Sequence, residues 1–177
     1  KALCDAGMNA EFIYGSDDLD PMDSLPVYLP KEKWSPCMGM PLCNIPAPGE
    51  GAANYADYYF QEFQEVFEKL GVKPRIYKMS EVYKSGKLDK WIKIVLENAD
   101  KIRETYKRVS GSEKGTEWLP FNVICEKCGK IGTTRVYDFD GKEVQYKCEP
   151  NLVAWAQGCG FESRTSPFNG NGKCPWK

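Results

Sequence analysis

Apolar positions in the first two thirds of the chain recur first at strand spacing and then at helix spacing. A short apolar run over residues 10–15 is of strand type, and small and acidic residues follow it at once. Aromatic and aliphatic side chains then recur every three or four positions from Tyr55 to Leu70, between a capping Asn54 and a terminating Gly71. This pattern predicts a buried strand followed by an amphipathic helix.

The alternation continues beyond Gly71. Residues 75–78 form a second predicted strand, and residues 80–83 a short helix that Gly86 ends. One long amphipathic helix is predicted from Leu88 to Val109, with its apolar positions on one face. A strand–helix–strand order is typical of parallel α/β sheets, so we predict a partial Rossmann-type parallel sheet with helices over residues 1–118.

Two further segments complete the pattern. Prolines recur through residues 21–52 and exclude long helices and central strands, so we expect a long ordered loop whose Cys37 and Cys43 are packed thiols. Residues 119–177 have strand character over 121–124, 133–139 and 143–147, with Asp140-Gly141 as a hairpin turn. We predict that they form a small β-rich, zinc-ribbon-like module, with a flexible exit over residues 168–172 and a return strand to the sheet.

Four cysteines in this last third carry the strongest chemical signal. Cys125 and Cys128 form a C-x2-C pair, and Cys148 and Cys159 follow with ten residues between them. Tetrahedral zinc favours four thiolates, and Gly129 and Gly160 allow backbone N–H groups to turn toward the sulfurs. A redox dithiol, two disulfides and unrelated buried thiols remain alternatives. We favour structural zinc.

Composition narrows the functional classes. The chain has no histidine, which excludes histidine-based nucleophilic catalysis and histidine metal ligands within these 177 residues. The net charge of −1 gives no overall field for nucleic acid or anionic lipid, and no apolar run is long enough to cross a membrane. Without an N-terminal signal pattern we expect a cytoplasmic protein, in which eight cysteines favour metal over disulfides.

Charge and position single out a few further residues. Asp17 and Asp18 follow the first strand, where they either face a functional crevice or cap a turn. Residues 87–108 carry seven basic and four acidic side chains, which fits a solvated helix face or, less readily, an RNA-facing surface. Cys4 and Cys174 lie near the two chain ends and could form a disulfide if those ends meet.

Several stretches, taken in order, resemble the class I lysyl-tRNA synthetases. They are Phe12-Ile13-Tyr14-Gly15-Ser16-Asp17-Asp18-Leu19-Asp20-Pro21, Gly39-Met40-Pro41-Leu42 with Ile45-Pro46, Asn54-Tyr55-Ala56-Asp57-Tyr58-Tyr59, Ser80-Glu81-Val82-Tyr83-Lys84-Ser85-Gly86, the cysteine module, and Pro175-Trp176-Lys177. The resemblance covers nearly the whole chain. It implies an enzyme that uses ATP with Mg²⁺ to activate lysine and then esterifies the 3′ end of tRNA.

The resemblance also implies that this chain is a middle piece. The two nucleotide-binding signature loops of the family are not in it, so we expect no catalytic residue here and no activity from the chain alone. Asp17 and Asp18 become candidates for the substrate crevice, and Lys127, Lys130 and Arg135 candidates for tRNA contact. We expect neither DNA nor a membrane as partner. The alternative is a non-catalytic zinc-ribbon module that binds RNA or a protein.

Overall fold

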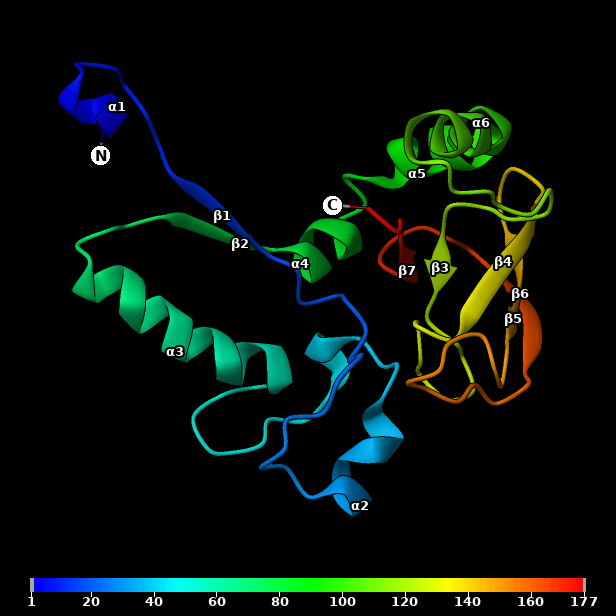
Figure 1. The fold of residues 1–177 in the computed structure, drawn as a ribbon, viewed down its shortest axis with the longest axis horizontal. Coiled ribbons are helices and arrows are strands. Elements are labelled where there is room, and N and C mark those ends of the chain that lie inside the picture. The colour runs from blue at the N-terminus through cyan, green and yellow to red at the C-terminus, as the bar shows by residue number, and fades with distance from the viewer. Residues whose placement is uncertain (1, 177) are drawn as a thin grey trace.

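The computed structural model describes residues 2–176, which form an elongated α/β part and a compact β-rich part (Figure 1). Strand β1 (Ile13–Ser16) pairs in parallel with β2 (Arg75–Lys78), with Tyr14 opposite Ile76. Helix α3 (Tyr55–Lys69) connects them, and a short helix α1 (Ala2–Asp5) precedes β1. This parallel pair with a helical crossover confirms the predicted α/β fold class.

Helix α3 forms where its apolar spacing and its end signals predict. The Asn54 side chain accepts the Asp57 N–H at 2.9 Å, and the Asn54 amide donates to the Asp57 carboxylate at 3.0 Å. Gly71 has φ +67°, a left-handed conformation that glycine adopts readily after a helix. The ring of Tyr14 on β1 packs against three phenylalanines of α3, which joins helix and sheet through aromatic contacts: Phe60, Phe63 and Phe67.

The proline-rich loop has a small core of its own. It contains the short helices α2 (Lys31–Trp34), η1 (Ser35–Cys37) and η2 (Leu42–Asn44). Its buried side chains form a cluster separate from the main core: Met22, Trp34, Ile45 and Tyr55. Cys37 and Cys43 are partly buried free thiols packed against these clusters. The loop is ordered by this burial and by backbone hydrogen bonds across it, such as the reciprocal pair in which Met22 N–H donates to the Met40 carbonyl and Gly39 N–H donates to the Met22 carbonyl, both at 2.8 Å.

The prediction of one long helix from Leu88 to Val109 is wrong in one respect, because the structure divides this stretch into two helices. Helix α4 (Met79–Lys84) is followed by α5 (Asp89–Glu97) and α6 (Ala99–Ser110), which separate at Asn98. Asn98 has φ −113° and ψ 25°, and its side-chain amide donates to the Ile94 carbonyl at 2.8 Å. An asparagine side chain that competes for backbone carbonyls favours such a break.

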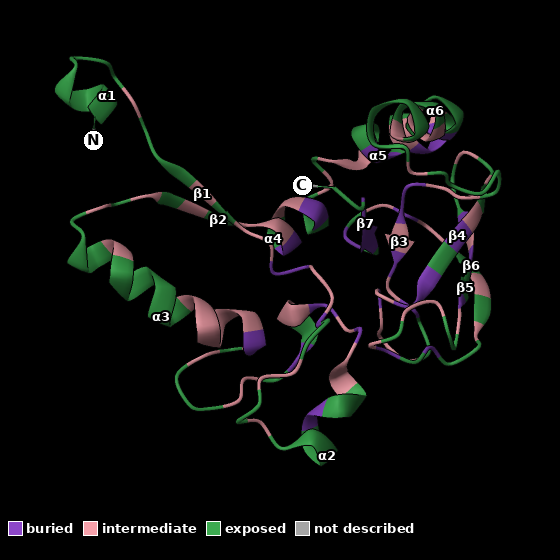
Figure 2. Cartoon of the chain, in the orientation of Figure 1, coloured by how far each residue is buried: buried purple, intermediate pink, exposed green. Residues whose placement is uncertain are grey.

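The β-rich part consists of two antiparallel sheets. Strand β3 (Asn122–Val123) pairs with β7 (Gly172–Lys173), while β4 (Thr134–Phe139), β5 (Val144–Cys148) and β6 (Glu162–Thr165) form a three-stranded sheet in that order. The main hydrophobic core lies here, and it includes Ile92 and Leu96 of α5. Figure 2 shows most buried positions in this half of the molecule. Residues on both sides of the predicted division at 118 thus share one core.

Residues 168–172, predicted as a flexible exit, make defined contacts. The Asn169 N–H donates to the Asp89 carboxylate at 3.0 Å, and Gly172 pairs with Val123. A Cβ at Gly170 would lie 2.7 Å from the Lys84 side chain, so the loop lies tightly against α4. The return strand is β7, and its partner among residues 2–176 is β3 rather than the parallel pair.

Cys4 and Cys174 are both free thiols. Cys4 lies on exposed α1 at one extreme of the molecule in Figure 1, whereas Cys174 is buried in the main core directly after β7. The suggested bridge is therefore not formed, because the two ends of the chain are held by different parts of the fold. None of the helices in residues 2–176 is both long and apolar enough to cross a bilayer.

Candidate functional site

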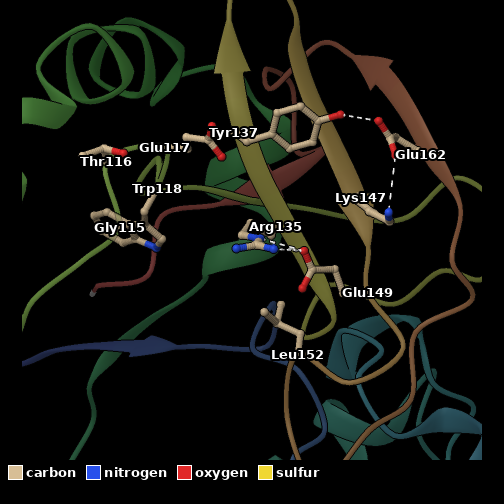
Figure 3. A pocket seen from close by; sticks show the side chains of 10 residues that line it. All are labelled: Gly115, Thr116, Glu117, Trp118, Arg135, Tyr137, Lys147, Glu149, Leu152 and Glu162. Atoms are coloured by element: carbon tan, nitrogen blue, oxygen red, sulfur yellow. Dashed lines mark hydrogen bonds and ion pairs between the residues drawn. The ribbon is translucent and has the colours of Figure 1, made fainter.

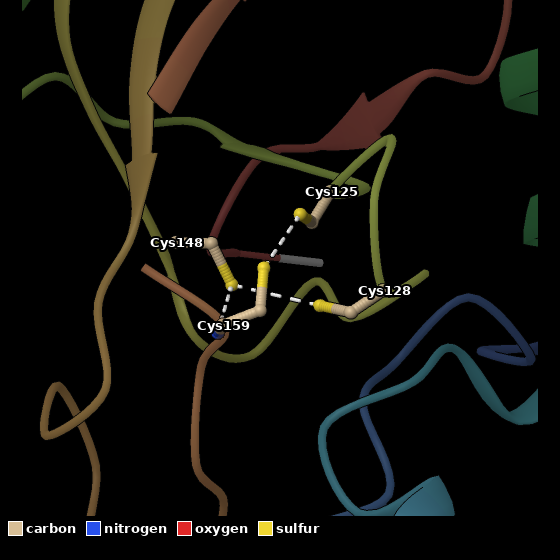
Figure 4. A group of neighbouring side chains, drawn as sticks. All are labelled: Cys125, Cys128, Cys148 and Cys159. Atoms are coloured by element: carbon tan, nitrogen blue, oxygen red, sulfur yellow. Dashed lines mark hydrogen bonds between the residues drawn. The ribbon is translucent and has the colours of Figure 1, made fainter. Parts of the chain in front are cut away.

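The four cysteines of the sequence pattern converge on one point (Figure 4). The sulfurs of Cys125, Cys128, Cys148 and Cys159 all lie within 4.8 Å of one another. The Cys125–Cys159 and Cys128–Cys148 sulfur distances are both 3.7 Å. Tetrahedral zinc with bonds of about 2.3 Å to sulfur places its sulfurs about 3.8 Å apart, whereas a disulfide bond measures about 2.05 Å. The geometry therefore fits a four-thiolate zinc site.

Two loops supply the sulfurs, and their backbones are hydrogen-bonded in the same way. In the first loop, the Cys125 N–H donates to the Lys130 carbonyl and the Gly129 N–H donates to the Cys125 carbonyl, both at 2.8 Å. In the second loop, the Cys148 N–H donates to Phe161 and the Gly160 N–H donates back to Cys148, again at 2.8 Å. Gly129 and Gly160 have φ +73° and +75°. The two loops are equivalent turns, each presenting two thiols.

The wide spacing of the second pair is explained by a closed neck. A Cβ on Gly158 would lie 2.3 Å from the Glu149 carbonyl oxygen, so the two ends of the ten-residue insertion touch directly. Residues 150–157 project from this neck, and Trp155 packs against Gly132. The insertion therefore leaves the Cys148–Cys159 turn intact, although its length weakens the sequence signal.

Hydrogen bonds and burial set the state of the thiols. Burial raises the pKa of the Cys125 and Cys128 thiols above the ordinary value. At Cys159 burial acts in the same direction, but hydrogen bonds from the Phe161 N–H and neighbouring thiols outweigh it and lower the pKa. The Cys159 N–H points at the Cys148 sulfur at 3.3 Å. Donors of this kind stabilise thiolates, which are the form that binds a metal.

The two carboxylates at the end of β1 have different surroundings. Asp18 is 3 % exposed and accepts hydrogen bonds from the Ser80 N–H at 2.8 Å and from the Ser80 hydroxyl. Because Ser80 lies in the first turn of α4, Asp18 caps that helix from a distant part of the chain. Asp18 thus has a structural role that the strand-edge pattern did not reveal.

Asp17 faces a buried cation. Lys173 of β7 is 6 % exposed, and its Nζ lies 3.0 Å from Asp17 Oδ1 and also contacts the Asp20 carboxylate. This network connects the end of the parallel pair to the β-rich part. Sequence reasoning missed Lys173, because nothing about a single lysine near the end of the chain indicates a partner more than 150 positions away.

A cavity of about 450 Å³ opens at the same strand end. Asp17, Asp18 and Ser16 line it from the β1 side, and tyrosines line it from α3 and the proline-rich loop. The Tyr28 and Tyr59 hydroxyls lie 3.1 Å apart, and burial together with hydrogen bonding raises the pKa of Tyr59. The cavity is of the size that small organic ligands occupy and lies where parallel sheets bind them.

The three basic residues suggested for RNA contact differ in how freely they are available. Arg135 pairs with Glu149, and the Lys130 ammonium donates to the Gln157 carbonyl at 2.9 Å. Lys127 is exposed. Arg135 also lines a cavity of about 600 Å³ in which Lys147 and the Tyr137 hydroxyl both face Glu162 (Figure 3). The cations of this cavity are thus already compensated by carboxylates.

Comparison with known proteins gives one consistent result. The family model described as "tRNA synthetases class I (K)" matches residues 1–177, the whole chain. The chain is also similar to curated proteins named lysine–tRNA ligase. It is 36 % identical over 178 residues to that of Methanocaldococcus jannaschii, and 37 % identical over 179 residues to that of Methanosarcina barkeri.

Coverage is unequal in these comparisons. The Thermoplasma acidophilum lysine–tRNA ligase is 34 % identical over 177 residues, and each of these three alignments covers 100 % of this chain. The share of the relatives is much smaller: 32 % of the Methanocaldococcus protein, 31 % of the Methanosarcina protein and 33 % of the Thermoplasma protein. The chain thus spans about a third of the length of the curated relatives it matches.

Proposed function

Because this chain belongs to the class I tRNA synthetases (K), we propose that it forms part of a lysine–tRNA ligase. The observation that carries this proposal is the match along the whole chain to proteins of that name. The complete enzyme would form lysyl-adenylate from lysine and ATP with Mg²⁺ and transfer the lysyl group to tRNA. This chain would contribute a sheet edge and the β-rich module, and the chain alone would not catalyse the reaction.

The exposed surface of the parallel pair supports a role within a larger sheet. Phe12, Ile13 and Tyr77 are 50 %, 45 % and 42 % exposed, and Phe63 of α3 is 43 % exposed. A two-stranded sheet buries too little apolar surface to be stable without further partners. Additional strands and helices of the same protein would cover these side chains and complete a Rossmann-type sheet.

In the complete enzyme, the β1 edge would form one wall of the substrate crevice. Asp17 and Ser16 line the cavity there, while Asp18 is engaged by Ser80 and holds α4 in place. Electrostatic positioning of reacting phosphates is the main requirement of such a reaction. We therefore assign these residues to shaping and orienting the crevice.

We assign Lys127, Lys130 and Arg135 to contact with the acceptor end of tRNA. Lys127 is exposed, whereas Lys130 would leave the Gln157 carbonyl and Arg135 would leave Glu149 on binding.

We further propose that Cys125, Cys128, Cys148 and Cys159 hold one structural zinc ion. The sulfur separations of 3.7 Å support this assignment, as do the matching hydrogen bonds of the two turns. With four thiolate ligands, zinc would have no open position for a substrate, and so it would stabilise the β-rich module rather than take part in the chemistry.

Elemental analysis tests the zinc proposal. We expect about one zinc per purified chain, loss of that zinc in Cys128→Ser, and full retention in Cys37→Ser, because Cys37 is a free thiol that lies outside the cluster. The proposal would be contradicted if the wild-type chain, purified from zinc-containing medium, held no metal. Equal metal loss in the two variants would contradict it as well.

The ligase proposal is tested with the longest protein that the gene encodes around this stretch. We expect lysine-dependent ATP–pyrophosphate exchange and lysylation of tRNA from that protein, and neither from the 177-residue chain. ATP–pyrophosphate exchange by the 177-residue chain would contradict the proposal that this chain alone is not catalytic. A longer protein that binds RNA or protein without any exchange would instead support the non-catalytic zinc-ribbon module.

A further inference from the structure

Helix α5 presents a large aromatic side chain to solvent. Trp91 is 59 % exposed, and the Lys90 ammonium lies 5.6 Å from the centre of its ring. A tryptophan usually buries most of its surface, so an exposed one beside a cation needs an explanation. At this distance the lysine makes a cation–π contact with the indole face.

Further exposed residues lie close to Trp91 in the chain. Lys90 directly precedes Trp91 on α5 and Ile94 follows it by three positions, while Lys87 lies in the turn just before the helix begins at Asp89; all three are exposed. We call Lys87, Lys90, Trp91 and Ile94 the Trp91 face. The opposite side of α5 is anchored, because Ile92 and Leu96 are 1 % and 4 % exposed within the main core. The Trp91 face is therefore held in a fixed orientation on the β-rich part.

The charge on this face is not compensated. Nearby carboxylates are engaged elsewhere: Asp89 accepts the Asn169 N–H, Glu97 pairs with Lys93, and Asp100 pairs with Arg103. Within residues 2–176, neither Lys87 nor Lys90 has a carboxylate partner. The basic excess seen in the sequence thus leaves two ammonium groups without a carboxylate partner, one of them over the exposed indole ring and the other four positions before it in the chain.

This combination fits nucleic acid better than a membrane or a protein. An interfacial helix turns its apolar side to the lipid, but the apolar side of α5 is buried in the core. A stable protein interface needs a larger apolar centre than Trp91 and Ile94 provide. Aromatic rings flanked by lysines are the usual platform on which bases stack while the backbone phosphates meet the cations.

We propose that the Trp91 face binds RNA, with one unpaired base stacked on the Trp91 indole and adjacent phosphates contacted by Lys87 and Lys90. The choice of RNA over DNA rests on the proposed function. Lys90 would leave the ring for a phosphate on binding, since the cation–π contact and the stacked base use the same surface. The site is separate from Lys127, Lys130 and Arg135 and extends RNA contact to the helices.

Binding of a fluorescein-labelled tRNA transcript to the longest protein that the gene encodes around this stretch, measured by anisotropy at several salt concentrations, tests this proposal. We expect Trp91→Ala to weaken binding about 5- to 10-fold with an unchanged salt slope, and Trp91→Phe to restore most of it. Lys87→Glu with Lys90→Glu is expected to lower the slope by about 1 to 2, because two phosphate contacts are lost. The matched control is the double variant Lys73→Glu with Lys142→Glu, which changes the net charge by the same amount at exposed positions outside the Trp91 face.

Each outcome has a clear meaning. Equal effects of the two lysine double variants on tRNA affinity would show that only net charge matters, which would overturn the proposal. Unaltered tRNA binding by Trp91→Ala would overturn it too, and so would a wild-type protein that does not bind tRNA. If the longer protein lysylates tRNA while these variants bind normally, only this inference fails. If the Trp91 face binds RNA but no lysine-dependent activity is found, only the ligase proposal fails.

Discussion

Lys173 Nζ lies 3.0 Å from Asp17 Oδ1, although 156 positions separate the two residues in the chain. The contact joins the end of strand β1 to strand β7, and Asp20 completes it from the same loop as Asp17. Because Lys173 is almost fully buried, its charge depends on these carboxylates for stabilisation. This network ties the crevice edge to the β-rich module.

Replacing Lys173 by methionine should therefore destabilise the protein. The change leaves two carboxylates without their buried cation, and removal of one partner from such a pair costs about 3–5 kcal/mol. Denaturant unfolding measures the effect. Lys69→Met is the matched control, since Lys69 pairs with Glu65 at 3.7 Å on the surface and should cost less than about 1 kcal/mol. Equal unfolding midpoints for the two variants would contradict the role of Lys173.

Asp18 and Ser80 should behave as one unit. Asp18→Ala removes both hydrogen bonds, whereas Ser80→Ala removes only the bond from the hydroxyl, because the Ser80 backbone N–H remains. The hydroxyl bond is lost in both single variants, so the double variant should be less destabilised than the sum of the single variants. We expect a coupling free energy of about 1–3 kcal/mol from a double-mutant cycle of unfolding free energies. Additive effects would mean that the carboxylate does not hold α4. A substrate role alone would leave unfolding unchanged.

Gly158→Ala should weaken the metal site without touching a sulfur. The new Cβ would meet the Glu149 carbonyl oxygen at 2.3 Å, which forces the neck of the second turn apart. We expect faster zinc loss to a chelator and a decrease in stability of about 1–3 kcal/mol. Gly115→Ala is the control, because no atom lies within 4 Å of its added Cβ. If both variants retain zinc equally, the closed neck is not required.

Cys174 should make stability depend on alkaline pH. Burial raises the pKa of this thiol from 9.0 to about 11, so the folded protein keeps the proton longer than the unfolded chain does. The stabilisation is complete below about pH 9 and is lost between pH 9 and 11, amounting to about 2–3 kcal/mol. Unfolding free energies from pH 8 to 11 measure it. Cys174→Ala should flatten the decline, whereas Cys4→Ala, at an exposed position, should not.

Much of the local structure could be predicted from the sequence. The apolar spacing from Tyr55 to Leu70, the Asn54 cap and Gly71 specify α3, because these signals act within a few residues of each other. The same holds for the C-x2-C turn at Cys125 and Cys128, whose glycine and hydrogen bonds lie inside six residues. Such elements depend on backbone conformation and short-range contacts, which the order of residues determines.

Other features were decided only by the tertiary structure. The break between α5 and α6 at Asn98 was not predicted, because the apolar spacing continues across it without interruption. Nor does sequence spacing show that the ends of the 149–158 insertion touch and restore the second cysteine turn.

The same limit applies to the carboxylates. Asp17 and Asp18 were correctly recognised as lying at a strand end, but their partners Lys173 and Ser80 come from distant elements. The sequence by itself determined which segments are strands, helices and thiol-bearing turns. Which charges meet was decided by the packing of those segments, because hydrophobic burial brings together residues that no local pattern connects.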